Sequence, residues 1–210
     1  MPRRYRGSEV SPNKQPLTSS HHRGPLLTVS VERMSLGGEG VARAGGEVVF
    51  IPYTAPGDVA EVEVVESHPR FSRAKVLRII TPGAQRQIAP CPYHFRPADE
   101  ASPDAARSRA AGIDQEFYCG GCNWQQIHYS GQLEAKRRLV KETLERIGGV
   151  RGVHVRPTLG MSEPWRYRNK VQQPVGWDAR RRQIVSGFFA PGSHAIVPID
   201  DCLVQPETSV

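Results

Sequence analysis

Four cysteines constrain this chain more than any other feature of its 210 residues. Cys119 and Cys122 form a Cys-Gly-Gly-Cys clip, Cys91 precedes the clip, and Cys202 follows it far downstream. Two thiolates on a short clip and two distant ones supply the ligand count of a tetrahedral zinc or of an iron–sulfur cluster. The two glycines of the clip lack a Cβ atom, so the backbone can fold closely around a bulky inorganic core. We therefore expect a metal or cluster site and leave the metal open.

Four cysteines also have simpler interpretations. Two disulfides would suit an exported protein, but the first residues carry charges without an apolar run, and no stretch could span a membrane. We therefore expect a cytoplasmic monomer without a membrane partner, in a compartment where disulfides are rare. A thioredoxin-like redox clip needs a core strand before it, which residues 113–116 do not supply. Four unrelated buried thiols are a further alternative.

Composition favours a turn-rich protein with a polyanionic partner. Hydrophobic residues make up 38% of the chain, and 18 prolines with 20 glycines predict many turns. The formal net charge of +7 favours nucleic acid as the partner. Residues 1–25 are rich in arginine, proline and polar side chains, and we predict a disordered basic tail there.

From residue 26 the pattern becomes period two. Leu27, Val29 and Val31 alternate with polar residues, and further alternating runs separated by glycine and proline turns continue to about residue 80. We therefore predict a small closed or nearly closed β-barrel over residues 26–85. Basic residues and an aromatic on its last strand suit single-stranded RNA, whereas the alternative is a solvated edge strand protected by its charges. The predicted RNA-binding residues of the barrel are Arg70, Phe71, Arg73 and Lys75.

Residues 86–210 are predicted to form an α+β domain. Residues 93–117 have loop chemistry and resemble an insertion between Cys91 and the clip. A helix is predicted from an N-cap at Ser130 to the pair Gly148-Gly149. Its exposed side should carry ion pairs four residues apart. We expect its apolar stripe to pack into the core, and that stripe consists of Leu133, Val140, Leu144 and Ile147.

Alternation returns beyond the helix and predicts strands at residues 153–155, 166–171, 184–189 and 195–199. Arg166, Arg168 and Lys170 share one face of the second of these strands, and a row of three cations fits contact with RNA phosphates. The last strand should deliver Cys202 to the clip. The chain also has histidines that could supplement a metal site, although isolated histidines are more often packing or surface residues; they are His94, His128, His154 and His194.

Five short segments, taken in order, resemble the bacterial RNA uracil-5-methyltransferases that carry an iron–sulfur cluster. They are Val-Glu-Arg-Met-Ser-Leu-Gly-Gly-Glu-Gly from residue 31, Cys91-Pro92, the clip, Tyr-Arg-Asn-Lys from residue 167, and Asp-Asp-Cys ending at residue 202. The resemblance covers about residues 26–210. It implies a five-stranded OB-like TRAM barrel, followed by a central domain that holds a [4Fe–4S] cluster. It also implies that Cys91, Cys119, Cys122 and Cys202 ligate the cluster, and that both parts hold ribosomal or transfer RNA.

Two departures from the family pattern shape the expected function. The first cysteine of the family lies only a handful of residues before the clip, and here residues 93–117 intervene. The family's S-adenosylmethionine-binding domain and its catalytic cysteine and carboxylate would follow Val210, so no catalytic residue is expected in this chain. We therefore expect the RNA-binding front portion of a methyltransferase, inactive by itself. The alternative is a free-standing RNA-binding protein with an iron–sulfur cluster or zinc.

Overall fold

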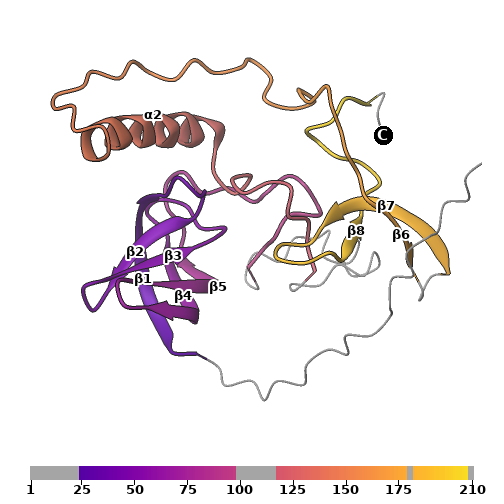
Figure 1. Cartoon of the computed structure of the whole chain (residues 1–210), viewed down its shortest axis with the longest axis horizontal. Helices are drawn as coiled ribbons and strands as arrows, with labels where there is room; N and C mark the ends of the chain where they lie inside the picture. The colour runs from indigo at the N-terminus through magenta and orange to yellow at the C-terminus, as the bar shows by residue number, and fades with distance from the viewer. Residues whose placement is uncertain (1–23, 98–116, 179–181, 208–210) are drawn as a thin grey trace, which may run out of the picture.

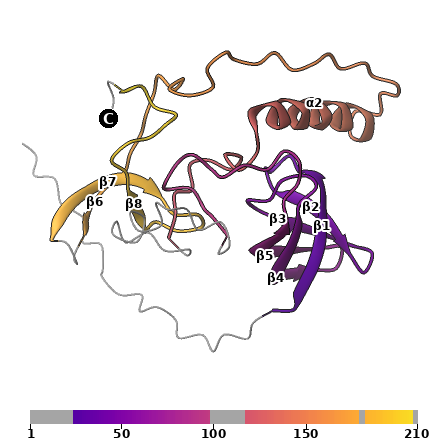
Figure 2. The same ribbon diagram turned by 180° about the vertical axis from the view of Figure 1, so that it is seen from behind.

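The computed structural model of the chain describes residues 24–97, 117–178 and 182–207. Strands dominate these residues, and no described helix is long and apolar enough to cross a membrane. The barrel and a small sheet lie on opposite sides of the molecule in both views (Figures 1 and 2). In chain order the elements are β1 Leu26–Met34, β2 Gly40–Ala44, β3 Glu47–Ile51, β4 Val59–His68, β5 Phe71–Thr81, α2 Tyr129–Arg146, β6 Val175–Asp178, β7 Gln183–Phe189 and β8 Ile196–Pro198.

The first five strands close into a barrel in the order β1-β2-β3-β5-β4, which confirms the predicted barrel. Neighbouring strands run antiparallel except β3 and β5, whose pairing is parallel and closes the ring. Alternate side chains point inward, so Val29, Val31, Ile51 and Val62 are almost completely buried. The hydrophobic burial expected from the sequence pattern is thus what holds the ring together.

The turn between β2 and β3 shows why a pair of glycines predicts a tight turn. Ala44 pairs with Glu47, so Gly45 and Gly46 form a two-residue loop. Their φ angles are 56° and 89°. A type I′ hairpin turn requires positive φ at both central residues, which glycine adopts without steric cost.

A buried ion pair attaches the barrel to the chain that follows it. The Asp58 side chain accepts hydrogen bonds from the backbone N–H groups of Ala55 at 2.6 Å and Gly83 at 2.8 Å. It also accepts one from Arg86 Nη1 at 2.7 Å, and both side chains of this pair are at most 2% exposed. Arg86 in turn forms an antiparallel bridge with Ile127, just before α2. The predicted boundary at residue 85 therefore lies within a segment that packs against both parts.

Helix α2 occupies the predicted position but differs at its start and on its apolar face. It is preceded by His128 rather than capped by Ser130, whose hydroxyl donates to Gln85 Oε1 at 3.2 Å. Gly149, with a φ of 67°, follows its end as expected. No residue of the helix is buried, and Val140 is 50% exposed, so the prediction that the stripe packs into the core is wrong.

The predicted ion pairs on α2 are present only in part. Lys141 and Glu145 pair at 3.9 Å as expected. Glu142 instead accepts from Arg138 at 2.7 Å and lies 3.3 Å from Arg33 of β1. One partner of the helix is therefore the barrel, which the local spacing of charges could not indicate.

Two strands predicted after α2 are not formed. The described chain has no strand between α2 and β6, and residues 150–174 run as an extended trace from the helix to the small sheet (Figure 1). Arg166 has a left-handed φ of 57°, which breaks an extended strand through residues 166–171. The predictions for residues 153–155 and 166–171 are therefore wrong.

Strands β7 and β8 lie where strands were predicted, whereas β6 was not predicted. β6, β7 and β8 form an antiparallel sheet in that order, and the chain then reaches Cys202. Within the predicted insertion, Tyr93 and His94 lie in a turn that is buried beside the cysteines, and residues 98–116 lie outside the described residues. Most of the predicted tail also lies outside, but Pro25 accepts a hydrogen bond from Val64 of β4 at 3.0 Å and so belongs to the barrel.

Candidate functional site

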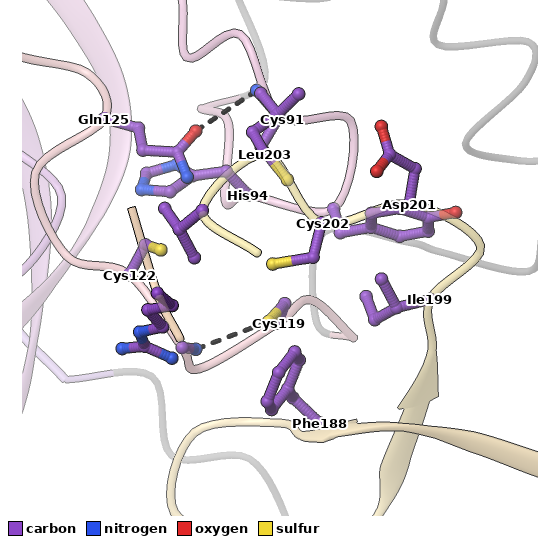
Figure 3. A pocket seen from close by; sticks show the side chains of 14 residues that line it. Cys91, His94, Cys119, Cys122, Gln125, Phe188, Ile199, Asp201, Cys202 and Leu203 are labelled. Carbon is purple, nitrogen blue, oxygen red and sulfur yellow. Dashed lines mark hydrogen bonds between the residues drawn. The ribbon is translucent and has the colours of Figure 1, made fainter. Parts of the chain in front are cut away.

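The four cysteines, which come from three distant segments, line one pocket. Figure 3 shows Cys91, Cys119, Cys122 and Cys202 around a shared space, with Leu203 among the apolar side chains beside them. All four are free thiols. An all-sulfur donor set in an apolar shell is the donor chemistry of a zinc or iron–sulfur site.

The pocket is nearly filled by its own side chains as it stands. Its cavity measures about 20 Å³, little more than one water needs. In the described part of the chain, no group of three or more His, Cys, Asp or Glu side chains is arranged to hold a metal ion. The donor types therefore fit a metal or cluster, but the thiol side chains must rearrange to receive one.

Backbone hydrogen bonds fix the segments that carry the cysteines. The Cys91 N–H donates to Gln125 Oε1 at 3.2 Å, drawn as a dashed line in Figure 3. The Cys119 N–H donates to the carbonyl of Tyr93 at 2.8 Å. The Tyr93 hydroxyl lies 3.0 Å from the donating N–H of Asp200, close to Cys202. The backbone at or near Cys91, Cys119 and Cys202 is thus anchored to a residue of another segment.

The clip glycines are required by close approach. The Gly120 N–H donates to the carbonyl of Phe189 at 3.0 Å, and a Cβ atom at Gly120 would lie 2.9 Å from that oxygen. The Gly121 N–H donates to Cys119 Sγ at 3.3 Å. Backbone hydrogen bonds to sulfur are among the contacts that tune iron–sulfur ligands.

Two of the thiols, Cys91 and Cys119, are held in their neutral form by their surroundings. Burial, with a smaller contribution from repulsion by the neighbouring thiolates, raises the pKa of Cys91 to about 12. Burial also raises the pKa of Cys119, which the positive charge of Arg168 partly offsets. Several thiolates can therefore exist together here only if a cation compensates them.

Of the four histidines that could supplement a metal site, His94 is the one that lines the cysteine pocket. It is 4% exposed and lines the cavity with the cysteines. Its Nδ1 lies 2.8 Å from the carbonyl of Phe95 and donates to it, while Nε2 has no hydrogen-bond partner among the described residues. Burial lowers the pKa of His94 to about 4, so the ring is neutral at physiological pH.

The predicted RNA-binding residues of the barrel are close together, but two of the cations are already paired. Arg73 forms an ion pair with Glu39, and Lys75 lies 3.0 Å from Glu63. Phe71 stacks on His68 with ring centroids 4.4 Å apart, and Arg70 is exposed. The surface is thus aromatic and charged, and its positive charge is partly neutralised by glutamates of the β1–β2 loop and of β4.

The predicted row of three cations does not exist, because residues 166–171 are not a strand. Arg166 points to Asp201, with its Nη1 2.6 Å and its Nη2 2.8 Å from the two carboxylate oxygens. This contact lowers the pKa of Asp201 and holds the loop that carries Cys202. Arg168 lines the cysteine pocket, and Lys170 is exposed.

A larger groove of about 950 Å³ adjoins the cysteine pocket. Its walls are the β1–β2 loop, the clip with Trp124, the first turns of α2, and residues 161–168. Arg168 lines both the pocket and the groove, whereas the other predicted RNA-binding residues line neither. No sequence signal indicated this groove, since it joins segments that are far apart along the chain.

Comparison with known families identifies the domain that the barrel forms. Residues 22–77 match the model of the TRAM domain. The chain contains a TRAM domain. The match covers β1 to β4 and most of β5, and thus confirms the predicted nature of the barrel.

Curated relatives extend the similarity beyond the TRAM barrel. An uncharacterized RNA methyltransferase of Halalkalibacterium halodurans is 36% identical over 186 residues, which are 89% of this chain and 35% of the relative. One of Gloeobacter violaceus is 36% identical over 183 residues, 87% of this chain and 35% of the relative. The chain thus spans about a third of the length of the RNA methyltransferases it matches.

A solved structure is similar over most of the chain. The crystal structure of the Pyrococcus abyssi tRNA (uracil-54, C5)-methyltransferase, in complex with S-adenosyl-L-homocysteine, is 23% identical. The similarity covers 90% of this chain and 34% of that protein, with a TM-score of 0.48.

Proposed function

We propose that this chain is the RNA-binding and [4Fe–4S]-binding front portion of an S-adenosylmethionine-dependent RNA uracil-5-methyltransferase that acts on ribosomal or transfer RNA. The observation that carries the proposal is the convergence of all four cysteines on one pocket beside a TRAM barrel. The names of the curated relatives support the methyltransferase assignment.

Cys91, Cys119, Cys122 and Cys202 would hold the cluster. Their donor type, the apolar shell and the sulfur-directed N–H of Gly121 support this role. The cations of the cluster would compensate the thiolate charges that burial otherwise disfavours. In this position the cluster would tie the clip, the loop after β8 and the Cys91 segment together.

The cysteine geometry supports the expectation that the chain is inactive by itself. Methylation of carbon 5 of uracil requires a thiolate that adds to carbon 6, hence a cysteine with a low pKa. All four cysteines of the sequence line the pocket, and Cys91, with a pKa of about 12, is a poor nucleophile at neutral pH.

Two measurements on the chain purified without oxygen test the proposal. We expect brown protein that contains iron and acid-labile sulfide, and no transfer of label from S-adenosylmethionine to unmodified RNA. A colourless preparation with one zinc per chain would replace the cluster by the zinc alternative. Labelled uridine that disappears in Cys91→Ala would overturn both the ligand assignment and the expected inactivity.

A further inference from the structure

We propose that the groove beside the cysteine pocket binds unpaired nucleobases of single-stranded RNA. This inference rests on the proposed RNA partner and places part of that RNA at a site the sequence did not indicate. The groove of about 950 Å³ lies within the size range of ligand sites, and the TRAM loop forms one of its walls. An RNA strand in the groove would therefore contact the barrel and the second half of the chain together.

Aromatic rings supply the groove with stacking surfaces that are already fixed in place. Trp124 donates its indole N–H to the carbonyl of Gly38 at 3.0 Å, which ties the ring to the barrel. The Tyr129 hydroxyl accepts the N–H of Met161 at 2.8 Å, which ties the α2 wall to the opposite segment. Because these polar groups are satisfied within the protein, the half-buried rings are already held in place and a base can stack on them at little ordering cost.

Tyr167 belongs to residues 166–171, for which a strand was predicted, and Trp165 comes directly before them. The Arg166 and Arg168 N–H groups donate to the carbonyls of Leu203 and Val204 at 2.8 and 2.9 Å, which fixes the backbone on either side of Tyr167. Tyr167 is 54% exposed and lines the groove. An exposed ring on an anchored backbone is suited to stack against a base.

The charges in the groove favour phosphate. Lys136 and Arg168 line it and no carboxylate does, although Arg168 also acts on the Cys119 thiol of the neighbouring pocket. On the barrel, by contrast, Arg73 and Lys75 are paired with glutamates. An RNA phosphate can therefore approach the groove cations without breaking an ion pair.

The combination of rings and cations selects single strands over duplex RNA. Bases in a duplex are stacked on one another and their faces are covered, so only unpaired bases can enter a groove lined by aromatic rings. A polypeptide could use the apolar walls, but only an acidic one would also pair with the two cations, whereas every nucleotide of an RNA strand carries a phosphate. The charge therefore favours RNA as the occupant.

The test measures binding of the anaerobically purified chain to a labelled, unstructured RNA oligonucleotide and to the same strand in a duplex. Tyr167→Ala should weaken single-strand binding about 5- to 150-fold, the effect of losing one stacked base, without changing the salt slope. Lys136→Gln should reduce that slope by about 0.7 for one lost phosphate contact. Trp177→Ala is the matched control, because Trp177 is a 64% exposed aromatic on β6 outside the groove.

A fluorescence measurement tests the groove with its lining intact. The chain has three tryptophans, and Trp177→Phe leaves only Trp124 and Trp165, both in the groove. Single-stranded RNA should quench this variant more than duplex RNA does.

The outcomes separate the two proposals. A wild-type chain that binds no RNA at low salt overturns the proposed function together with this inference. A second set of results would overturn the inference alone. In that case the wild type binds RNA in a salt-dependent way, Tyr167→Ala keeps normal affinity, Lys136→Gln keeps the normal salt slope, and RNA does not quench the tryptophan fluorescence. The RNA then lies on the barrel, and the groove serves another occupant such as a polypeptide.

Discussion

Removing the Asp58 carboxylate should destabilise the barrel far more than removing a surface charge. The side chain is completely buried and accepts hydrogen bonds from Ala55, Gly83 and Arg86. In Asp58→Ala the Arg86 guanidinium keeps its charge in a site where its side chain is only 2% exposed. Breaking a buried pair by removing one partner costs about 3–5 kcal/mol, and two backbone N–H groups also lose their acceptor.

This decrease in the free energy of unfolding should lower the Tm measured by circular dichroism. For a chain of this length each kcal/mol lowers Tm by about 2–4 °C, so we expect a decrease of about 6–20 °C. Glu32→Ala provides the control, because the Arg43–Glu32 pair is on the same barrel but its side chains are 59% and 47% exposed. Such a pair contributes about 1 kcal/mol or less.

A double variant tests the reason for the effect. If the loss of the carboxylate beside the buried guanidinium is the cause, Asp58→Ala/Arg86→Leu should be no less stable than Asp58→Ala, because the buried charge is removed together with the carboxylate. A double variant that loses the sum of both single effects, or an Asp58→Ala variant as stable as Glu32→Ala, would refute the reasoning.

Three further predictions concern the cysteine pocket. Cys122→Ser should lose the colour and iron of the anaerobic chain and unfold at a lower temperature, as measured by iron analysis and circular dichroism, whereas unchanged iron would exclude it as a ligand. Gly120→Ala should reduce iron content, since its Cβ would lie 2.9 Å from the carbonyl oxygen of Phe189, whereas Gly37→Ala, which meets only the flexible Glu39 carboxylate at 3.3 Å, should not. Folding lowers the pKa of His94 from 6.5 to about 4. As the pH falls, the unfolded chain therefore takes up this proton before the folded chain does. The free energy of unfolding should be highest above pH 6.5 and should decrease toward pH 4. Relative to His94→Gln, the wild type should lose on the order of 2–3 kcal/mol over this range in urea titrations, and equal pH profiles would contradict the burial effect.

The barrel could be predicted because local signals determine most of it. Alternating side chains such as Val29 and Val31 mark an inward face, and Gly45-Gly46 permits only a tight turn between β2 and β3. The parallel pairing of β3 with β5 closes the ring and could not be predicted residue by residue. It joins strands that are not neighbours in the chain, so no local pattern encodes it.

Periodicity predicted which residues share a face but not what covers that face. The α2 stripe lies where 3.6-residue spacing places it, yet Leu144 is 39% and Ile147 76% exposed. Residues 166–171 were assigned to a strand from alternating cations rather than from alternating apolar residues. The left-handed backbone conformation of Arg166 is enough to prevent a continuous strand there.

Charge is the property for which the sequence was most misleading, because a count of cations ignores their partners. Arg73 and Lys75 stand out in the sequence, but the fold brings Glu39 from the β1–β2 loop and Glu63 from β4 against them. A phosphate on these cations must compete with a carboxylate that is already in place. Lys136 is inconspicuous on the exposed side of a helix, yet the fold places it in a groove without carboxylates. Its phosphate contact costs no existing ion pair, so Lys136→Gln should reduce the salt dependence of RNA binding more than Lys75→Gln does.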